Sequence, residues 1–366
     1  MNLENIDLNA NITYNIKKFD LDLDNDEIKK NIEGNKENNE FLKDTLAEDN
    51  KKLEDNKDNE DNKDNEDNKN IEDGKNVEDD KNIEEEIKID YDTLVLAGGS
   101  SKGIVTLGAL QYAYDNYLIK NVNKYVGTSS GAMISFLLAI GYTPIEIITY
   151  ICCNQLLEKI LHFNIVAMIN GEGASSFTNI YESFEKMTIE KIGFLPTFRD
   201  LKERFGKTLV FVTYNITENK AEYLSYETYP NLPCLIAIRM SANLPLIFEK
   251  YKYGNSYYID GGVCDNFAID IGDKIGNKIL GIVLNSRKED FSNEPDMNIL
   301  EYIYKIMFIP VSQILEYKLK NISDKCKIVN LDYNKIKFFN FDINSKEKLE
   351  MFSSGYMQMK KQFENI

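Results

Sequence analysis

Histidine is nearly absent from this chain of 366 residues, which contains only His162. Histidine is the usual general base of serine hydrolases and the commonest protein ligand of metals, so its scarcity excludes most sites of either kind. A zinc site of the His-Glu-x-x-His type cannot be built from one histidine. A Ser-His-Asp triad would have to use His162, which lies in an apolar segment and which we interpret as a structural residue.

Cysteine and long apolar runs are also scarce. The five cysteines show neither the spacing of metal ligands nor a disulfide framework, which favours a reducing compartment. No stretch reaches the roughly 18 consecutive apolar residues of a membrane span. The N-terminus lacks the basic segment and apolar core of a signal peptide. From these absences we expect a soluble, intracellular protein.

Basic residues are in deficit, and the deficit lies almost wholly in residues 1–88. This segment holds 14 Lys against 29 Asp and Glu, and so carries −15 of the net charge of −17. Residues 54–70 repeat the hexamer Glu-Asp-Asn-Lys-Asp-Asn, with almost no apolar side chains to offset the entropy of ordering. We interpret 1–88 as a disordered acidic tail, or alternatively as a partner-binding or autoinhibitory one. Neither part has the basic surface that nucleic acids require.

From residue 91 onward, strand-like and helix-like patterns alternate. Strands are expected at 93–97, 124–126, 208–214, 256–259, 279–284 and 327–331. Helices are expected at 104–117, 130–140, 144–161, 232–240, 297–320 and 346–363. The helix at 144 begins with a capping box from Thr143 to Glu146. This alternation predicts an α/β domain over 89–366, with a mostly parallel central sheet and helices on both faces.

One pentapeptide, Gly127-Thr128-Ser129-Ser130-Gly131, lies between an apolar strand and an apolar helix. This is the pattern of a nucleophile elbow, in which a serine is held at a tight strand-to-helix turn. The glycines remove Cβ atoms that would collide there. Ser129 is therefore the candidate nucleophile.

With no usable histidine, the base that activates Ser129 has to be a carboxylate. Asp260-Gly261-Gly262 follows a strand-like segment, and its glycines leave the aspartate in a sharp turn at a strand end. The alternative is an ordinary Asp-Gly turn without a catalytic role. Asp260 is the best candidate in the chain.

A glycine-rich turn, Gly98-Gly99-Ser100-Ser101-Lys102-Gly103, follows the first strand. It fails the phosphate-loop pattern because Lys102 precedes the last glycine, and it fails the dinucleotide pattern because residue 100 is serine. This leaves a nucleotide-binding protein as a weak alternative. Backbone amides at such a strand-to-helix turn are equally suited to stabilising an oxyanion.

In their order along the chain (98–103, 127–131 and 260–262), the three motifs resemble those of the patatin-like phospholipases. That family has a glycine-rich loop with a Lys or Arg, a G-x-S-x-G elbow and a later Asp-Gly-Ala/Gly. Residues 239–245 resemble a fourth block of the family, and Asn266 also fits. The resemblance spans roughly 91–290, and 291–366 forms a helical C-terminal extension.

The resemblance implies a three-layer sandwich and a lipid acyl hydrolase of the phospholipase A type. Ser129 would attack the acyl carbonyl and Asp260 would accept its proton. The amides of Gly98, Gly99 and Ser100 would stabilise the oxyanion, and an acyl-enzyme would follow. Neither a metal nor another cofactor is implied.

The implied substrate is a lipid or phospholipid ester, and with it a transient contact with a membrane surface. Residues 300–315, rich in aromatic and aliphatic side chains, are a candidate for that contact, although such a run is more often part of a core. The acidic tail should disfavour anionic bilayers through charge repulsion.

Two residues depart from the family pattern. Ser100 stands where the family usually has a third glycine, and because serine resists positive φ, we expect an ordinary backbone angle there. Ala268 replaces a proline that is common after the aspartate block. The Ser100 departure and the long acidic tail keep open an alternative function, a catalytically weak or inactive binding or regulatory protein on the same fold.

Overall fold

The computed structural model describes residues 90–157, 160, 173–284, 299–335 and 341–364. The predicted acidic tail and His162 lie outside these residues.

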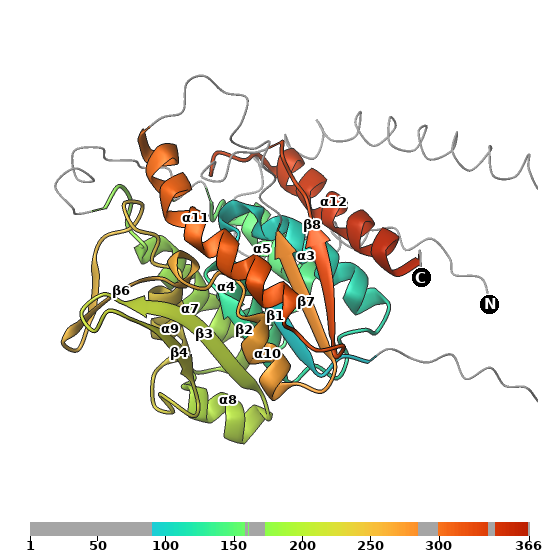
Figure 1. The fold of residues 1–366 in the computed structure, drawn as a ribbon, viewed down its shortest axis with the longest axis horizontal. Coiled ribbons are helices and arrows are strands. Elements are labelled where there is room, and N and C mark those ends of the chain that lie inside the picture. Colours follow the sequence, from blue (N-terminus) through green and yellow to red (C-terminus); the bar gives the residue numbers. More distant parts are fainter. Residues whose placement is uncertain (1–89, 158–159, 161–172, 285–298, 336–340, 365–366) are drawn as a thin grey trace, which may run out of the picture. The chain divides into compact units, whose positions relative to one another are not determined.

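The described residues form an eight-stranded mixed sheet (Figure 1). Its strands are β1 (Thr93–Leu96), β2 (Lys124–Thr128), β3 (Thr208–Asn215), β4 (Lys220–Ser225), β5 (Tyr251–Tyr253), β6 (Ser256–Asp260), β7 (Ile279–Leu284) and β8 (Cys326–Leu331). The order is β5-β6-β3-β2-β1-β7-β8, and β4 also pairs with β3. Strands β3, β2, β1, β7 and β8 are parallel, whereas β4, β6 and β5 add antiparallel pairs. The α/β prediction is confirmed, whereas β4 and β5 were not predicted.

Helices cover both faces of this sheet. They are α3 (Gly103–Asp115), α4 (Ser130–Ala139), α5 (Pro144–Cys153), α7 (Thr178–Ile192), α8 (Phe198–Phe205), α9 (Cys234–Ser241), α10 (Ile269–Ile275), α11 (Ile299–Lys320) and α12 (Ser345–Glu364). The Thr143 capping box is present at the start of α5. That helix ends at Cys153, well before the predicted residue 161, and α7, α8 and α10 were not predicted.

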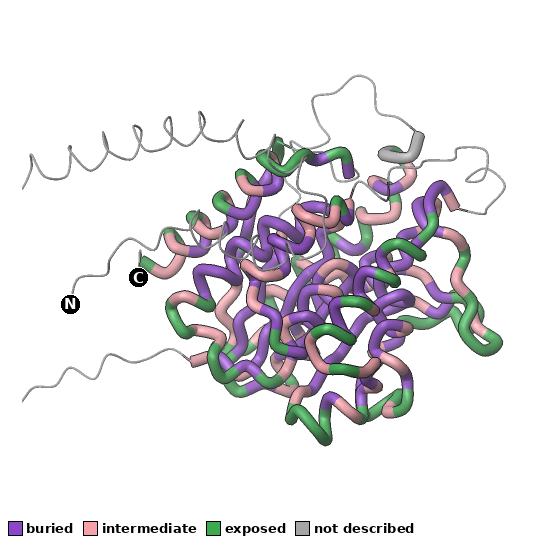
Figure 2. The backbone as a smooth tube through the Cα atoms, turned by 180° about the vertical axis from the view of Figure 1, so that it is seen from behind, coloured by how far each residue is buried: buried purple, intermediate pink, exposed green. Residues whose placement is uncertain are grey.

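Two hydrophobic cores lie on opposite faces of the sheet, because side chains alternate along each strand. On β1, Leu94 and Leu96 join the core under α3, α4 and α12, whereas Val95 packs into the smaller core under α10 and α11. Figure 2 shows the buried segments gathered around the sheet. The arrangement is the predicted three layers.

Helices α3 and α12 pack with their backbones in direct contact. A Cβ atom on Gly108 would lie 1.8 Å from the carbonyl oxygen of Phe352, and one on Gly355 would lie 1.9 Å from that of Val105. Only glycine permits this approach on either helix. The C-terminal helix is therefore part of the larger core.

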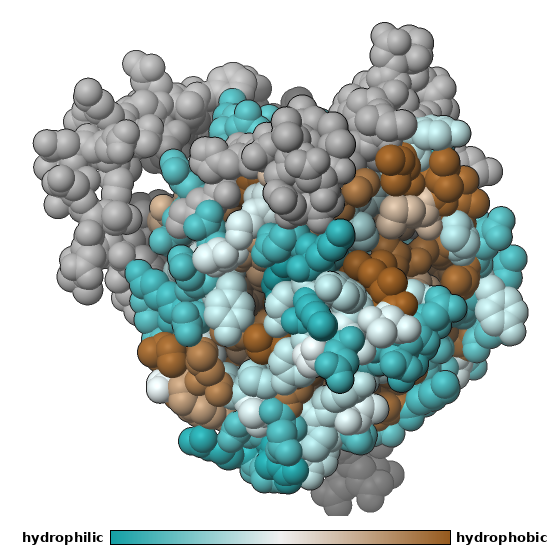
Figure 3. Space-filling view, turned by 90° about the vertical axis from the view of Figure 1, so that its left-hand side faces the viewer, coloured by the Kyte–Doolittle hydropathy of each residue, from teal (hydrophilic) through white to brown (hydrophobic). Residues whose placement is uncertain are grey.

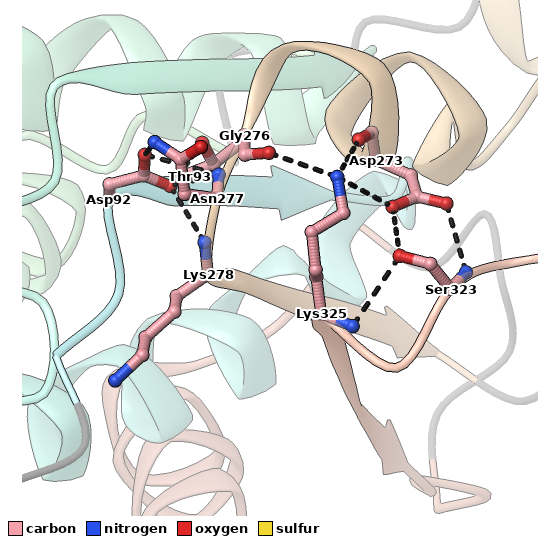
Figure 4. Close-up of polar contacts among 8 residues, drawn as sticks. All are labelled: Asp92, Thr93, Asp273, Gly276, Asn277, Lys278, Ser323 and Lys325. Atoms are coloured by element: carbon pink, nitrogen blue, oxygen red, sulfur yellow. Dashed lines mark hydrogen bonds and ion pairs between the residues drawn. The ribbon is translucent and has the colours of Figure 1, made fainter.

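Polar contacts tie the amino-terminal edge of the parallel strands together (Figure 4). Asp92 accepts hydrogen bonds from the amides of Asn277 and Lys278 and from the Lys124 ammonium. Burial opposes the charge on Asp92, but these hydrogen bonds outweigh it and lower its pKa to about 2. Nearby, Ser323 donates to Asp273 and joins β8 to α10. This network lies opposite the carboxyl ends of the strands, which remain free for a site.

Among the described helices, none is long and apolar enough to cross a membrane by itself. Helices α4 and α5 pass that test only as a pair, bent by 119° at their junction. Both contribute many buried side chains to the larger core.

Candidate active site

One edge of β3 brings the elbow and the aspartate turn together. Strand β2 runs along this edge until Thr128 pairs with Val212. Strand β6 approaches along the same edge from the opposite direction, and its last residue, Asp260, pairs with Thr213. Because the two strands end opposite neighbouring residues of β3, the residues that follow them meet in space.

The chain makes a tight strand-to-helix turn at Ser129, between β2 and α4. Ser129 has φ 55° and ψ −123°, a conformation that L-residues rarely adopt and that aims the side chain away from the turn. A Cβ atom on Gly127 would lie 2.6 Å from the amide nitrogen of Ala132, and one on Gly131 would lie 2.3 Å from the carbonyl oxygen of Leu96. Both glycines are therefore needed for α4 to start so close to β1 and β2.

The two predicted side chains are in direct contact. The hydroxyl of Ser129 donates to Asp260 Oδ2 at 2.6 Å, and the amide of Gly262 donates to Oδ1 at 2.7 Å. Ser129 is 6% exposed and Asp260 is 1% exposed. Burial penalises the carboxylate, the two hydrogen bonds partly offset this, and the pKa of Asp260 is raised to about 7. A carboxylate with this pKa is suited to take up a proton near neutral pH.

The glycine-rich turn contacts both the segment that follows Asp260 and the residue next to Ser129. Its Gly98 amide donates to the backbone carbonyl of Asn266, and the Asn266 side chain donates back to the Gly98 carbonyl. The Gly99 amide donates to the Ser130 hydroxyl at 3.0 Å. We expected the Gly98 amide among the oxyanion donors, but it is already used to hold the turn in place.

Ser100 differs from the sequence-based expectation as well. Its φ is 51°, in the left-handed region that favours glycine, so the serine here is strained. Its amide has no hydrogen-bond partner among the described residues, and neither do the buried hydroxyls of Ser100 and Ser101. Lys102 is buried directly before Gly103, which starts α3. The Ser100 amide is thus a donor that remains available in this turn.

A pocket opens beside Ser129. Ser100, Ser101 and Ser130 line it together with Ser129. Its remaining wall is apolar and includes Met133, Leu156, Phe184, Leu244, Phe248 and Phe341. Such a pocket, with few polar groups at one end, suits a ligand with an apolar chain. These wall residues come from distant parts of the chain, and no sequence motif joins them.

Tyr304 of α11 closes another side of the site. Its side chain is buried, and its hydroxyl donates to the carbonyl of Pro245. Burial and the nearby Asp260 charge raise the pKa of Tyr304 well above its ordinary value. Tyr304 belongs to no sequence motif, although it lies within the 300–315 run that was a candidate for membrane contact. Within the described residues, no group of three or more His, Cys, Asp and Glu side chains is placed to hold a metal ion.

Two sequence comparisons found proteins similar to this chain. A family model described as patatin-like phospholipase matches residues 94–273. A probable lipid hydrolase, 463L, of Invertebrate iridescent virus 6 is 38% identical over 207 residues, which cover 55% of this chain and 68% of that protein.

Solved structures with similar folds are more distant. VipD from Legionella pneumophila is 15% identical, with a TM-score of 0.45, over 75% of this chain and 67% of that chain. A human GIVD cytosolic phospholipase A2 is 9% identical, with a TM-score of 0.43, over 75% of this chain and 57% of that chain. On the evidence of the two sequence matches, the chain belongs to the patatin-like phospholipase family.

Proposed function

We propose that this protein hydrolyses carboxylic esters of lipids through a Ser129–Asp260 dyad, in the manner of a phospholipase A. The observation that carries the proposal is the 2.6 Å hydrogen bond from Ser129 Oγ to the buried Asp260 carboxylate, beside an apolar pocket. Membership of a family of lipid hydrolases supports the substrate class.

The reaction has two symmetrical halves. Ser129 Oγ attacks the acyl carbonyl carbon while its proton moves to Asp260. The tetrahedral intermediate then expels the alcohol, which takes that proton and leaves an acyl group on Ser129. In the second half, water attacks the acyl-enzyme and gives a proton to Asp260. Release of the fatty acid returns this proton to Ser129.

The oxyanion would be held by backbone amides. The Ser100 amide is available, and the Gly99 amide becomes available when the Ser130 hydroxyl turns toward another partner. Each donor of this kind typically lowers the barrier by roughly 2.7–4 kcal/mol. We assign the oxyanion hole to Gly99 and Ser100, with Gly98 as the residue that anchors the turn.

Helix α11 is the surface that we propose for contact with uncharged lipid. Its outward face exposes Tyr302, Ile306, Ile309, Ile314 and Tyr317, each between 40% and 70% exposed. Apolar atoms gather at the upper right of Figure 3, where the front of the view in Figure 1, with α11, comes to lie. Between Tyr302 and Tyr317 the only charged residues are Lys305 and Glu316, whose charges are opposite, so the face matches an uncharged lipid surface better than an acidic or basic partner.

Contacts on the inner side of α11 fix the position of this helix beside the site. Tyr304 bonds the carbonyl of Pro245, and Lys318 forms ion pairs with Asp265 and Asp270 at 2.6 Å and 2.5 Å. Asp265 follows closely after Asp260 and also accepts from Tyr223. Lipid bound to the outer face would therefore lie one helix away from the dyad.

Ser129→Ala and Asp260→Asn should each lower kcat/KM for a phospholipid or short-chain ester by more than about 1000-fold, because each removes half of the dyad. Ser135→Ala is the matched control, since Ser135 is also buried and its hydroxyl has no partner among the described residues. A fluorophosphonate probe should label Ser129 in the folded full chain. A wild-type protein that neither hydrolyses esters nor reacts with the probe would instead be the binding or regulatory protein.

The pH dependence should follow the pKa of Asp260, about 7. Below it the protonated carboxyl cannot accept a proton, so kcat/KM should rise about tenfold per pH unit and level off above about pH 7. The pKa is raised on folding, so the stability contributed by the protonated group is lost as pH rises through about 7. Relative to wild type, Asp260→Asn should therefore gain thermal stability progressively from about pH 4 to about pH 7, and the gain should stay constant above pH 7. A flat activity profile over this range would contradict Asp260 as the base.

Replacement of Ser100 by glycine should relieve backbone strain. An L-residue in this region costs roughly 1–2 kcal/mol, whereas the freedom that glycine adds to the unfolded chain costs about 0.5–1 kcal/mol. Ser100→Gly should therefore leave the free energy of unfolding unchanged or raise it. The neighbouring Ser101 also has a hydroxyl without a partner among the described residues, but its φ is not positive. Ser101→Gly should therefore lower the free energy of unfolding by about 1 kcal/mol. Urea denaturation midpoints measure both, and equal losses would argue against strain at Ser100.

Two negative charges introduced into the exposed face of α11 should weaken binding to lipid without affecting the dyad. Ile306→Glu combined with Ile309→Glu should reduce binding to phosphatidylcholine vesicles roughly 100-fold, since two large apolar side chains are lost from the contact. Hydrolysis of a soluble short-chain ester should not change. Ile189→Glu, on the exposed end of α7, is the matched control. Vesicle flotation measures binding, and unchanged binding of the double variant would exclude α11 as the docking surface.

A further inference from the structure

The backbone amide of Ser129 has an unusual partner. Because the elbow turns sharply after β2, this amide donates to the side-chain hydroxyl of Ser241, with an N–O distance of 3.0 Å. Ser241 is 0% exposed and is the last residue of α9. In a buried elbow, an amide without this acceptor would have neither protein nor solvent to bond. The contact therefore holds the strained φ of 55° at Ser129 in place.

The segment that carries Ser241 also holds the other half of the dyad. The backbone amide of Asp260 donates to the carbonyl of Asn243 at 2.9 Å. The Asn243 side chain donates to the carbonyl of Tyr258, two residues before Asp260, at 2.8 Å. One short stretch at the end of α9 thus bonds the backbone of both Ser129 and Asp260.

This stretch is itself rigidly held. The Thr213 hydroxyl on β3 lies within hydrogen-bond distance of the carbonyls of Met240 and Ile259, and so links the end of α9 to β6. Arg239 donates to the Asn243 side chain and forms an ion pair with Glu249 at 2.9 Å. Its guanidinium also lies over the ring of Phe177. An acceptor on a rigid segment can fix the position of its donor.

From this geometry we infer that Ser241 is a positioning residue for the nucleophile. It acts through the Ser129 amide and sets where the Ser129 hydroxyl stands relative to Asp260 and to the ester. The inference rests on the proposed function, since it gives that dyad its alignment. No proton passes through Ser241, whose hydroxyl accepts a hydrogen bond from the backbone amide of Ser129.

Ser241→Ala removes the acceptor without adding bulk. The rate of fluorophosphonate labelling at Ser129 and the kcat for a short-chain ester should each fall roughly 10- to 100-fold, because misplacement of a reacting group slows the chemical step. KM should change less than about twofold, since the pocket wall is untouched. Ser135→Ala, which removes an equally buried hydroxyl without a partner, should keep the wild-type rates.

The outcomes separate the two proposals. If wild type and Ser135→Ala fail to react with the probe or the ester, the proposed function itself is wrong. If they react and Ser241→Ala reacts equally fast, or shows only a raised KM, the positioning role is wrong. If Ser241→Ala does not fold, Ser241→Cys carries the same test, because sulfur fills the site but accepts a hydrogen bond weakly. Ser241→Cys should then show a loss of kcat that is smaller than the roughly 10- to 100-fold loss expected for alanine, and wild-type kcat would overturn the inference.

Discussion

Strand β3 sets the distance on which the whole site depends. Strands β2 and β6 end opposite Val212 and Thr213, so the backbone ladder alone brings Ser129 and Asp260 within hydrogen-bond reach. Backbone pairing holds such a distance more firmly than flexible loops would, because each strand is fixed by several hydrogen bonds. The glycines of the elbow, the Asn266 contacts and the end of α9 then adjust the orientation of groups that the sheet has already placed.

Burial decides what a carboxylate can do in this setting. An exposed aspartate is ionised near neutral pH but binds protons too weakly to be an effective base there. Enclosure of Asp260 raises its proton affinity toward that of a histidine, while the Ser129 hydroxyl and the Gly262 amide keep its charged form accessible. Asp260 thus has the proton affinity for acid–base chemistry that usually depends on histidine, of which this chain contains only one.

Local patterns predicted the motifs and most of the parallel strands, with β7 matching the expected 279–284. Strand β4 was missed because its Glu222 is buried, held by Asn215 and Tyr229, and so breaks the alternation that marks a strand. Helix α8 carries a capping box at Thr197 that could have revealed it. The use of the Gly98 amide and the role inferred for Ser241 depend on contacts across 168 and 112 residues, which no local pattern encodes.

The glycine contact between α3 and α12 has a consequence for how the protein is made. Helix α3 follows the first strand and is synthesised before the other described α-helices, whereas α12 is synthesised after them. Until α12 emerges, the Gly108 face of α3 and the apolar residues around it have nothing to cover them. The larger core can therefore close only after α12 has been synthesised, and a premature stop before residue 345 would leave a permanently open, aggregation-prone chain.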